Sequence, residues 1–150
     1  MGNTTNKLFR MIEEDPYEFL NKMDNHKLAS NKSLFTAFFY QMLDEKNISI
    51  KEITLKTNIS QSHLYQIISG TKGVGRDKAI LISTAMELTL DQTQKFLELS
   101  QNSPLYPKVK RDAIIICCIE FGMSITEINE KLEEKNEKGL IWRNGLWKTI

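Results

Sequence analysis

The chain has 150 residues, of which 41% are hydrophobic and 26% charged, and its formal net charge is +1. This balance is that of a globular protein with a packed core, and it excludes an extensively disordered chain. The longest apolar run, near residues 113–119, is too short to span a bilayer, and the N-terminus lacks the apolar core of a signal peptide, so we expect a cytoplasmic protein without membrane contact.

The near-neutral charge differs from that of a strongly basic nucleic-acid binder. In none of the segments 1–32, 33–100 and 101–150 do Lys and Arg outnumber Asp and Glu by more than one residue. Non-specific attraction to DNA phosphates should therefore be weak. Specific binding would depend on a few well-placed side chains and helix N-termini.

Apolar residues recur every three or four positions along most of the chain, which predicts an all-α protein. A first short helix is expected to start at Asp15, with Pro16 at its first helical position. Residues 25–32 have the composition of a linker. Ser33 is expected to cap a helix that runs to about Lys46 and carries apolar residues on more than one face, so this helix should pack against two neighbours.

Six further helical segments are predicted after this one. They are expected at residues 49–57, 61–69, 76–87, 90–100, 108–121 and 124–136. A break with two prolines spans 102–107, Gly122 ends the fifth of these helices, and residues 137–150 show no clear pattern. A capping box, in which two side chains satisfy orphan amide groups, is predicted at three of the helix starts. The pairs are Ser49…Glu52, Thr89…Gln92 and Ser124…Glu127.

A short sequence echo links residues 49–53 and 124–128. The echo could mark a duplicated helix-turn-helix. Two similarly capped amphipathic helices are favoured over duplication, because such caps are common.

The segment 48–70 satisfies the requirements of two helices that meet at a steep angle. Thr54 is a small residue at the expected close approach of the helices, and Asn58 tolerates left-handed dihedral angles at the turn. Ser60 can cap the second helix. Four apolar residues would fix the pair to a core: Ile53, Ile59, Leu64 and Ile67.

Residues 34–99 resemble the Cro/C1-type (XRE, lambda-repressor-like) helix-turn-helix family. The matching pieces are Ile48-Ser49, Asn58-Ile59-Ser60 at the turn, Gly70-Thr71-Lys72 after the second helix, and 85–91 before the last helix. The resemblance implies a compact five-helix DNA-binding domain and a transcriptional regulator of double-stranded DNA. The expected organisation is an N-terminal extension over 1–32, this domain over 33–100, and a C-terminal helical extension over 101–150.

The resemblance also assigns roles to individual residues. The helix Gln61–Ser69 would enter the major groove, where Gln61, Ser62 and Gln66 match the base-reading positions. His63 and Tyr65 could touch base or phosphate. Four cationic residues match or suit phosphate contacts: Lys51, Lys72, Arg76 and Lys78.

The sequence departs from the family pattern in ways that favour an alternative function. Ile50 stands where the family often has a Gln that bridges phosphate and recognition helix, and residues 61–69 contain no Lys or Arg. A protein-interaction adaptor that keeps the fold with little DNA readout is therefore the second hypothesis. An enzyme is not expected, because His63 has no catalytic partner in any recognisable motif, and the glycines at 70–75 lack the Gly-Lys-Ser/Thr ending of a phosphate loop.

The C-terminal third is expected to supply contacts beyond the DNA-binding domain. The apolar segment 108–121 should be buried on most sides, either in a homodimer or in one monomeric core, and we favour the dimer because closed two-fold dimers are the commonest assembly. A protein partner could also bind this extension. Cys117 and Cys118 are interpreted as buried thiols in a reducing compartment, with no metal or cofactor. Trp142 and Trp147 could anchor the tail.

Overall fold

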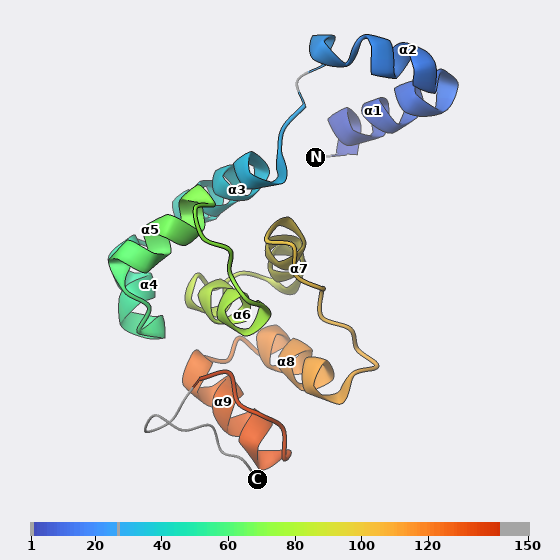
Figure 1. The fold of residues 1–150 in the computed structure, drawn as a ribbon. Coiled ribbons are helices and arrows are strands. Elements are labelled where there is room, and N and C mark those ends of the chain that lie inside the picture. Colours follow the sequence, from blue (N-terminus) through green and yellow to red (C-terminus); the bar gives the residue numbers. More distant parts are fainter. Residues whose placement is uncertain (1, 27, 142–150) are drawn as a thin grey trace. The chain divides into compact units, whose positions relative to one another are not determined.

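A computed structural model describes the backbone of residues 2–26 and 28–141, and the side chains of these residues except 2–4 (Figure 1). The described residues form nine α-helices and one 3-10 turn and contain no strand, which confirms the all-α prediction. The chain divides into two compact units, Met1–Ser30 and Asn31–Ile150.

The first unit consists of α1 (Gly2–Glu14), α2 (Pro16–Asn21) and the 3-10 turn η1 (Met23–Asn25). The predicted start of α2 is confirmed: the Asp15 carboxylate accepts a hydrogen bond from the Glu18 N–H at 3.1 Å, and Pro16 is the first helical residue. Phe19 is buried and stacks on the His26 ring, with the ring centroids 4.6 Å apart. The sequence pattern does not predict α1, because no capping residue or proline marks its start.

The second unit contains the remaining seven helices. They are α3 (Asn31–Lys46), α4 (Ile50–Thr57), α5 (Gln61–Ser69), α6 (Arg76–Ala85), α7 (Leu90–Leu99), α8 (Lys110–Glu120) and α9 (Ile125–Glu134). Their order and approximate bounds agree with the predicted segments. The expected cap at Ser33 is wrong, because α3 begins at Asn31 and Ser33 already lies within its first turn.

In the core of this unit, α3 packs against both α5 and α7. Three phenylalanines meet there: Phe35 and Phe39 from α3 and Phe96 from α7, with ring centroids 5.2–5.9 Å apart. Phe39 and Phe96 are completely buried. Tilted and edge-on ring pairs of this kind stabilise a core beyond the area that they bury. The cluster explains why the apolar residues of α3 cover more than one face.

Three helix junctions share one backbone geometry. Asn47, Glu87 and Gly122 adopt left-handed dihedrals, with φ of 53°, 59° and 70°. The next residue in each case donates its N–H to the carbonyl five positions earlier, at 3.0–3.1 Å, and a capping box follows. The three predicted capping boxes are confirmed. The α6–α7 junction has the same form as the junctions before α4 and α9. The echo between 49–53 and 124–128 therefore reflects a recurring type of helix junction and gives no support to a duplicated helix-turn-helix.

The C-terminal helices α8 and α9 belong to the same core as α3–α7. Helix α8 packs on α7 and α9 packs on α6, and Ile115, Cys118, Ile128 and Leu132 join the buried cluster. Asn129 of α9 is fully buried, and its Oδ1 accepts the N–H of Leu140, near the end of the described chain, at 2.7 Å. Residues 110–141 are therefore a structural part of this unit.

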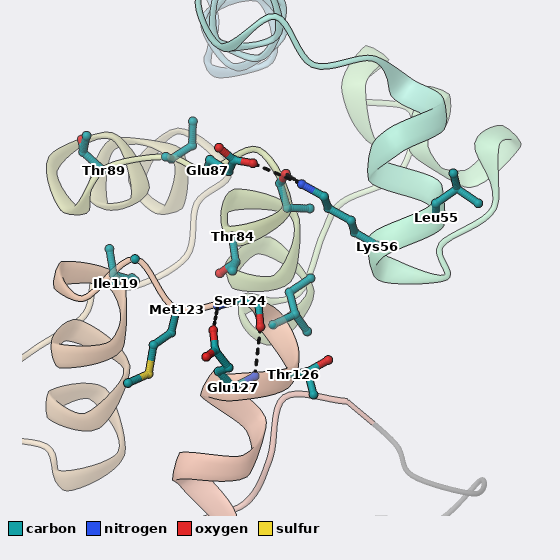
Figure 2. Close-up of a pocket in the computed structure, with 14 residues that line it drawn as sticks. Leu55, Lys56, Thr84, Glu87, Thr89, Ile119, Met123, Ser124, Thr126 and Glu127 are labelled. Carbon is teal, nitrogen blue, oxygen red and sulfur yellow. Dashed lines mark hydrogen bonds and ion pairs between the residues drawn. The ribbon is translucent and has the colours of Figure 1, made fainter.

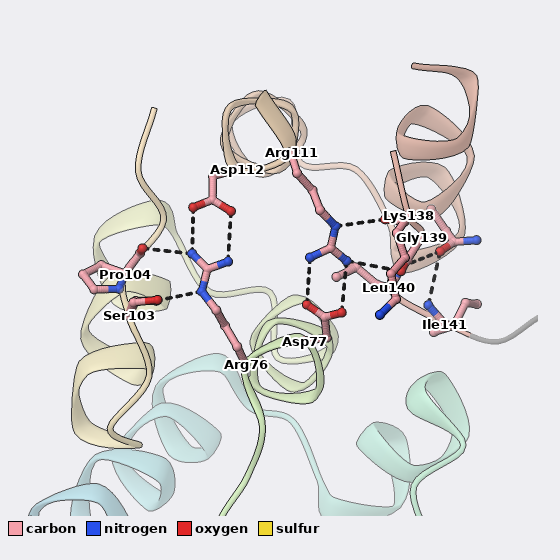
Figure 3. Close-up of polar contacts among 11 residues, drawn as sticks. Arg76, Asp77, Ser103, Pro104, Arg111, Asp112, Lys138, Gly139, Leu140 and Ile141 are labelled. Carbon is pink, nitrogen blue, oxygen red and sulfur yellow. Dashed lines mark hydrogen bonds and ion pairs between the residues drawn. The ribbon is translucent and has the colours of Figure 1, made fainter. Parts of the chain in front are cut away.

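Two Arg-Asp dipeptides connect α6 to α8 reciprocally (Figure 3). Arg76, at the start of α6, donates two hydrogen bonds to the Asp112 carboxylate at 2.9 and 2.7 Å. Arg111 donates two to Asp77 at 2.9 and 3.0 Å. Bidentate pairs of this geometry are the strongest type of ion pair. The two pairs thus fix the N-terminal turns of α6 and α8 side by side.

The expectation that 108–121 is buried on most sides is wrong. In α8 only Asp112, Ile115 and Cys118 are buried, whereas Cys117 is exposed and Phe121, which ends the helix, is 77% exposed. Successive residues of a helix point about 100° apart, so adjacent cysteines cannot both face one core. Trp142 and Trp147, the predicted anchors, lie outside the described residues.

Candidate nucleic-acid interface

Helices α4 and α5 are joined by a short, tightly hydrogen-bonded turn. Asn58 ends α4 in a left-handed conformation with φ 62°, and its N–H donates to the Thr54 carbonyl at 2.8 Å. The Thr57 hydroxyl donates to the Ile53 carbonyl at 2.7 Å and accepts from the Ile59 N–H at 3.2 Å. These hydrogen bonds therefore restrict the angle between α4 and α5.

The start of α5 is capped as predicted, since the Ser60 hydroxyl accepts a hydrogen bond from the His63 N–H at 3.1 Å. The predicted apolar anchors are all buried: Ile53, Ile59, Leu64 and Ile67. At the other end of α5, Gly70 is left-handed and the Thr36 hydroxyl of α3 donates to the Ile68 carbonyl. Both ends of α5 are thus held in place.

The left-handed dihedrals of Asn58 lead to a prediction about stability. Asn58→Ala is expected to lower the free energy of unfolding by about 1 kcal/mol, because a Cβ without a local hydrogen-bonding group disfavours positive φ. Asn58→Gly should preserve or raise stability, since glycine adopts this conformation freely. Urea denaturation of the three proteins measures the difference. An alanine variant as stable as the parent would contradict this account of the turn.

Helix α5 presents a polar face to solvent. Leu64, Ile67 and Ile68 are buried. Gln61, Ser62 and Tyr65 are exposed, and His63 and Gln66 are half-buried. All five side chains predicted for base or nearby contacts therefore have accessible surface, and they come from one helix that the core holds on its opposite side.

A shallow groove of about 560 Å³ lies between α5 and α3. Its lining includes Ser62, Tyr65 and Gln66 from the polar face of α5, with Thr36 and Tyr40 from α3. Tyr40 is 51% exposed. Tyr40 is not among the predicted contacts, because the apolar residues of α3 predict a core helix. The position of Tyr40 opposite the core-facing phenylalanines is the signal that could have identified it.

Two of the predicted phosphate-binding lysines, Lys72 and Lys78, lie near His63 of α5. Lys51 is exposed in the first turn of α4. The pKa of His63 is lowered by burial and by the positive charges of Lys78 and Lys72. His63, Lys72 and Lys78 therefore form one cationic neighbourhood, although they come from α5, the following loop and α6. The structure thus places two of the predicted phosphate-binding residues close to the predicted recognition helix.

Arg76 does not join this neighbourhood, which corrects its assignment as a phosphate contact. Besides its two bonds to Asp112, its Nε donates to the Ser103 carbonyl and its Nη2 to the Pro104 carbonyl, both at 2.9 Å (Figure 3). The guanidinium is therefore occupied by α8 and the loop before it. The sequence places Arg76 next to the glycine loop but cannot show that the Arg76 side chain pairs with Asp112, 36 positions later.

Another groove of this unit, larger than the one beside Tyr40, lies away from α5. It encloses about 800 Å³ between α4, the α6–α7 junction and the α8–α9 junction (Figure 2). Leu55 of α4 lines it and is 74% exposed, while Lys56 bridges to the Ala85 carbonyl and to Glu87 at 3.4 and 3.3 Å. Ile119 and Met123 line the opposite side. This groove is partly apolar and has no counterpart in the predicted DNA contacts.

In the part of the chain that the structure describes, no three His, Cys, Asp or Glu side chains gather as a metal site would require. No described helix has the length and apolar character needed to cross a membrane. Comparisons with family models, curated proteins and solved structures found no match for this chain.

Proposed function

We propose that this protein binds double-stranded DNA sequence-specifically, as a transcriptional regulator, with α5 in the major groove. In this proposal α3–α7 form a lambda-repressor-like domain. The observation that carries it is the construction of α5: a capped helix, fixed at both ends, that buries Leu64, Ile67 and Ile68 and presents Gln61, Ser62 and Gln66 outward. An α-helix presented in this way fits the width of the major groove.

The side chains on this face are suited to reading base edges. Gln can donate to and accept from adenine in a bidentate pair, and Ser can pair with either kind of base. Tyr65, which is 46% exposed, offers an apolar ring for thymine methyl groups. Lys51, Lys72 and Lys78 would contact the phosphates on either side of the groove. Arg76 is not part of this proposal.

A protein-interaction adaptor is the alternative that specific observations favour. The face of α5 carries no Lys or Arg, and Arg76 is engaged within the protein. The groove beside Leu55 offers a partly apolar surface to a protein ligand. Under this alternative the protein would co-purify with a stoichiometric protein partner, and nuclease treatment would leave that complex intact.

A mobility-shift experiment separates the two functions. DNA fragments that tile the genomic neighbourhood of the gene are incubated with the purified protein at low salt and with unlabelled competitor. We expect one or a few fragments to shift specifically, with an affinity that falls as salt rises. Failure to shift any fragment at low salt would contradict DNA binding and favour the adaptor.

His63 leads to a prediction about pH. Because its pKa is lowered in the free protein and a nearby phosphate would stabilise the imidazolium, DNA binding should take up a proton. Affinity should therefore rise as the pH falls through the region between the pKa of His63 in the DNA complex and its lower pKa in the free protein. His63→Gln should remove this dependence. His26, the other histidine, lies in the first unit, so His26→Gln is the matched control and should keep it. Fluorescence anisotropy at several pH values measures the DNA affinity of the parent and of both variants. Equal slopes of affinity against pH for the parent and His63→Gln would refute the role of His63.

A further inference from the structure

The first hairpin of this region comprises α6, α7 and the loop after them (76–106), and the second comprises α8, α9 and their loop (111–141). Helices α7 and α9 start at positions 90 and 125 and end at 99 and 134, which are 35 positions apart in both cases. Each loop contains a left-handed residue with φ 63°, Gln101 and Asn136. Each loop also has a buried leucine whose N–H donates at 2.7 Å to a side-chain carbonyl of the preceding helix: Leu105 to Gln94, and Leu140 to Asn129. The hydrogen-bond pattern of one hairpin thus recurs in the other.

An arginine near the start of each hairpin makes the same loop contacts. Arg76 donates to the Ser103 and Pro104 carbonyls. Arg111 donates to the Lys138 and Gly139 carbonyls, again 35 positions later. Buried apolar residues correspond as well: Ile80 with Ile115, and Leu97 with Leu132. The junction geometry that also occurs between α3 and α4 requires none of these contacts, so their joint recurrence at one spacing indicates an internal repeat.

The two hairpins contact each other reciprocally, as the subunits of a two-fold dimer do. Arg76 of the first hairpin pairs with Asp112 of the second, and Arg111 of the second pairs with Asp77 of the first (Figure 3). Helix α6 packs on α9, and α7 packs on α8. Exchange of the two hairpins maps each of these contacts onto another that is present. This relation requires an approximate two-fold axis between α6 and α8.

Where the sequences of the hairpins differ, one difference compensates for another. The first hairpin has Gln94 and Pro104, whereas the second has the shorter Asn129 and Gly139 at the equivalent positions. A Cβ at position 139 would lie 2.3 Å from the Asn129 Oδ1, so the shorter amide side chain requires a glycine in the loop. The proline at position 104 is attributed to the longer reach of Gln94.

We infer that residues 76–106 and 111–141 are two copies of one helical-hairpin repeat, paired about an internal two-fold axis, and that the second copy positions the start of α6. Arg111 of the second copy holds Asp77, and the next residue, Lys78, is a proposed phosphate contact. The positioning role rests on the proposed function, whereas the repeat does not. The repeat is therefore tested on the protein alone, and the positioning role is tested by DNA binding.

A loop exchange tests the repeat. In one full-length variant, Asn129→Gln is combined with the sequence of residues 100–106 in place of 135–141. The control variant has the same Asn129→Gln change but receives the sequence of residues 101–107, which shifts the proline and the leucine out of register by one position. We expect the in-register variant to unfold cooperatively in urea at a midpoint near that of the parent, and the control to unfold at a clearly lower midpoint. Equal stability of the two variants, or a less stable in-register variant, would overturn the repeat.

Arg111→Met tests the positioning role. This variant should reduce the slope of log DNA affinity against log salt by about 1, because Lys78 would no longer be held beside a phosphate. Lys110→Met is the matched control and should keep the parent slope, since Lys110 bonds to the Lys135 carbonyl and lies near Glu137, both within the second copy. Destabilisation alone lowers the fraction of active protein and leaves the slope unchanged.

The outcomes separate the two parts of the inference from the proposed function. A parent-like slope for Arg111→Met, or an equal loss of slope for Lys110→Met, would reject the positioning role while DNA binding by α5 stands. If the parent binds no DNA fragment, the proposed function fails and the positioning role fails with it. The loop exchange decides the repeat in either case.

Discussion

Replacing Asp112 with alanine is expected to lower the free energy of unfolding by about 3–5 kcal/mol, the usual effect of removing one partner from a buried pair. The Asp112 side chain is 6% exposed and that of Arg76 is 26% exposed. The carboxylate accepts three hydrogen bonds, two from Arg76 and one from the Tyr106 N–H at 2.9 Å. The variant would leave the Arg76 guanidinium partly buried without its counter-charge, and it would remove the acceptor of the Tyr106 N–H in the loop before α8.

A double variant that removes both charges checks that the loss comes from this pair. The Arg76→Met/Asp112→Leu protein should be less destabilised than Asp112→Ala, because no unpaired charge remains. Asp91→Ala removes an exposed carboxylate from the first turn of α7 and serves as the control, with an effect below about 1 kcal/mol. Urea denaturation measures each value. A loss below about 1 kcal/mol for Asp112→Ala would contradict the role of this pair.

The same carboxylate makes stability depend on pH. Burial alone would raise the pKa of Asp112, but hydrogen bonds from Arg76 and the Tyr106 N–H, with the charges of Arg76 and Arg111, outweigh burial and lower it. A carboxyl group with a lowered folded-state pKa stabilises the fold above its unfolded pKa, and this contribution is lost as the pH falls through the folded pKa. Asp112→Asn should therefore flatten the acid side of the stability profile.

The second large effect concerns DNA affinity. The Gln61→Ala/Gln66→Ala protein should bind its specific fragment about 100-fold or more weakly, because each bidentate pair with adenine contributes about 1–3 kcal/mol of discrimination. Its affinity for non-specific DNA should change little, since neither residue is charged. Gln41→Ala, at an exposed glutamine of α3 that bonds to Glu45, is the matched control and should bind normally.

Removal of the proposed phosphate-binding lysines should affect DNA binding differently from removal of the glutamines. Lys72→Ala/Lys78→Ala should weaken binding to specific and non-specific DNA alike and reduce the slope of log affinity against log salt by about 2. Fluorescence anisotropy over a salt series separates the two classes of variant. If the glutamine variant instead lost specific and non-specific binding equally, that result would contradict base reading by α5.

Local features of the fold were predictable from the sequence because their causes are local. The Ser60 cap, the left-handed Asn58 and the three capping boxes depend on residues within four positions of one another. The burial of Ile53 and Leu64 follows from helical periodicity.

Long-range pairing set the features that the sequence could not predict. Arg76 was assigned to phosphate because it follows a loop next to the recognition helix, and its partner Asp112 is 36 positions away. Cys117 was expected to be buried because the run 113–119 is apolar, and only the packed structure shows which side of α8 meets α7 and α9. The base contacts and the dimer remain predictions, since their partners lie outside this chain.

Selection of genomic DNA fragments, run in parallel with the parent protein and the Gln61→Ala/Gln66→Ala variant, tests the role of α5 most directly. We predict that the parent enriches a small set of fragments that share an inverted repeat with half-sites about one helical turn apart. The variant should lose that enrichment while retaining its folded helical spectrum. Enrichment of no sequence by the parent, or of the same fragments by both proteins, would contradict the proposal that α5 reads DNA.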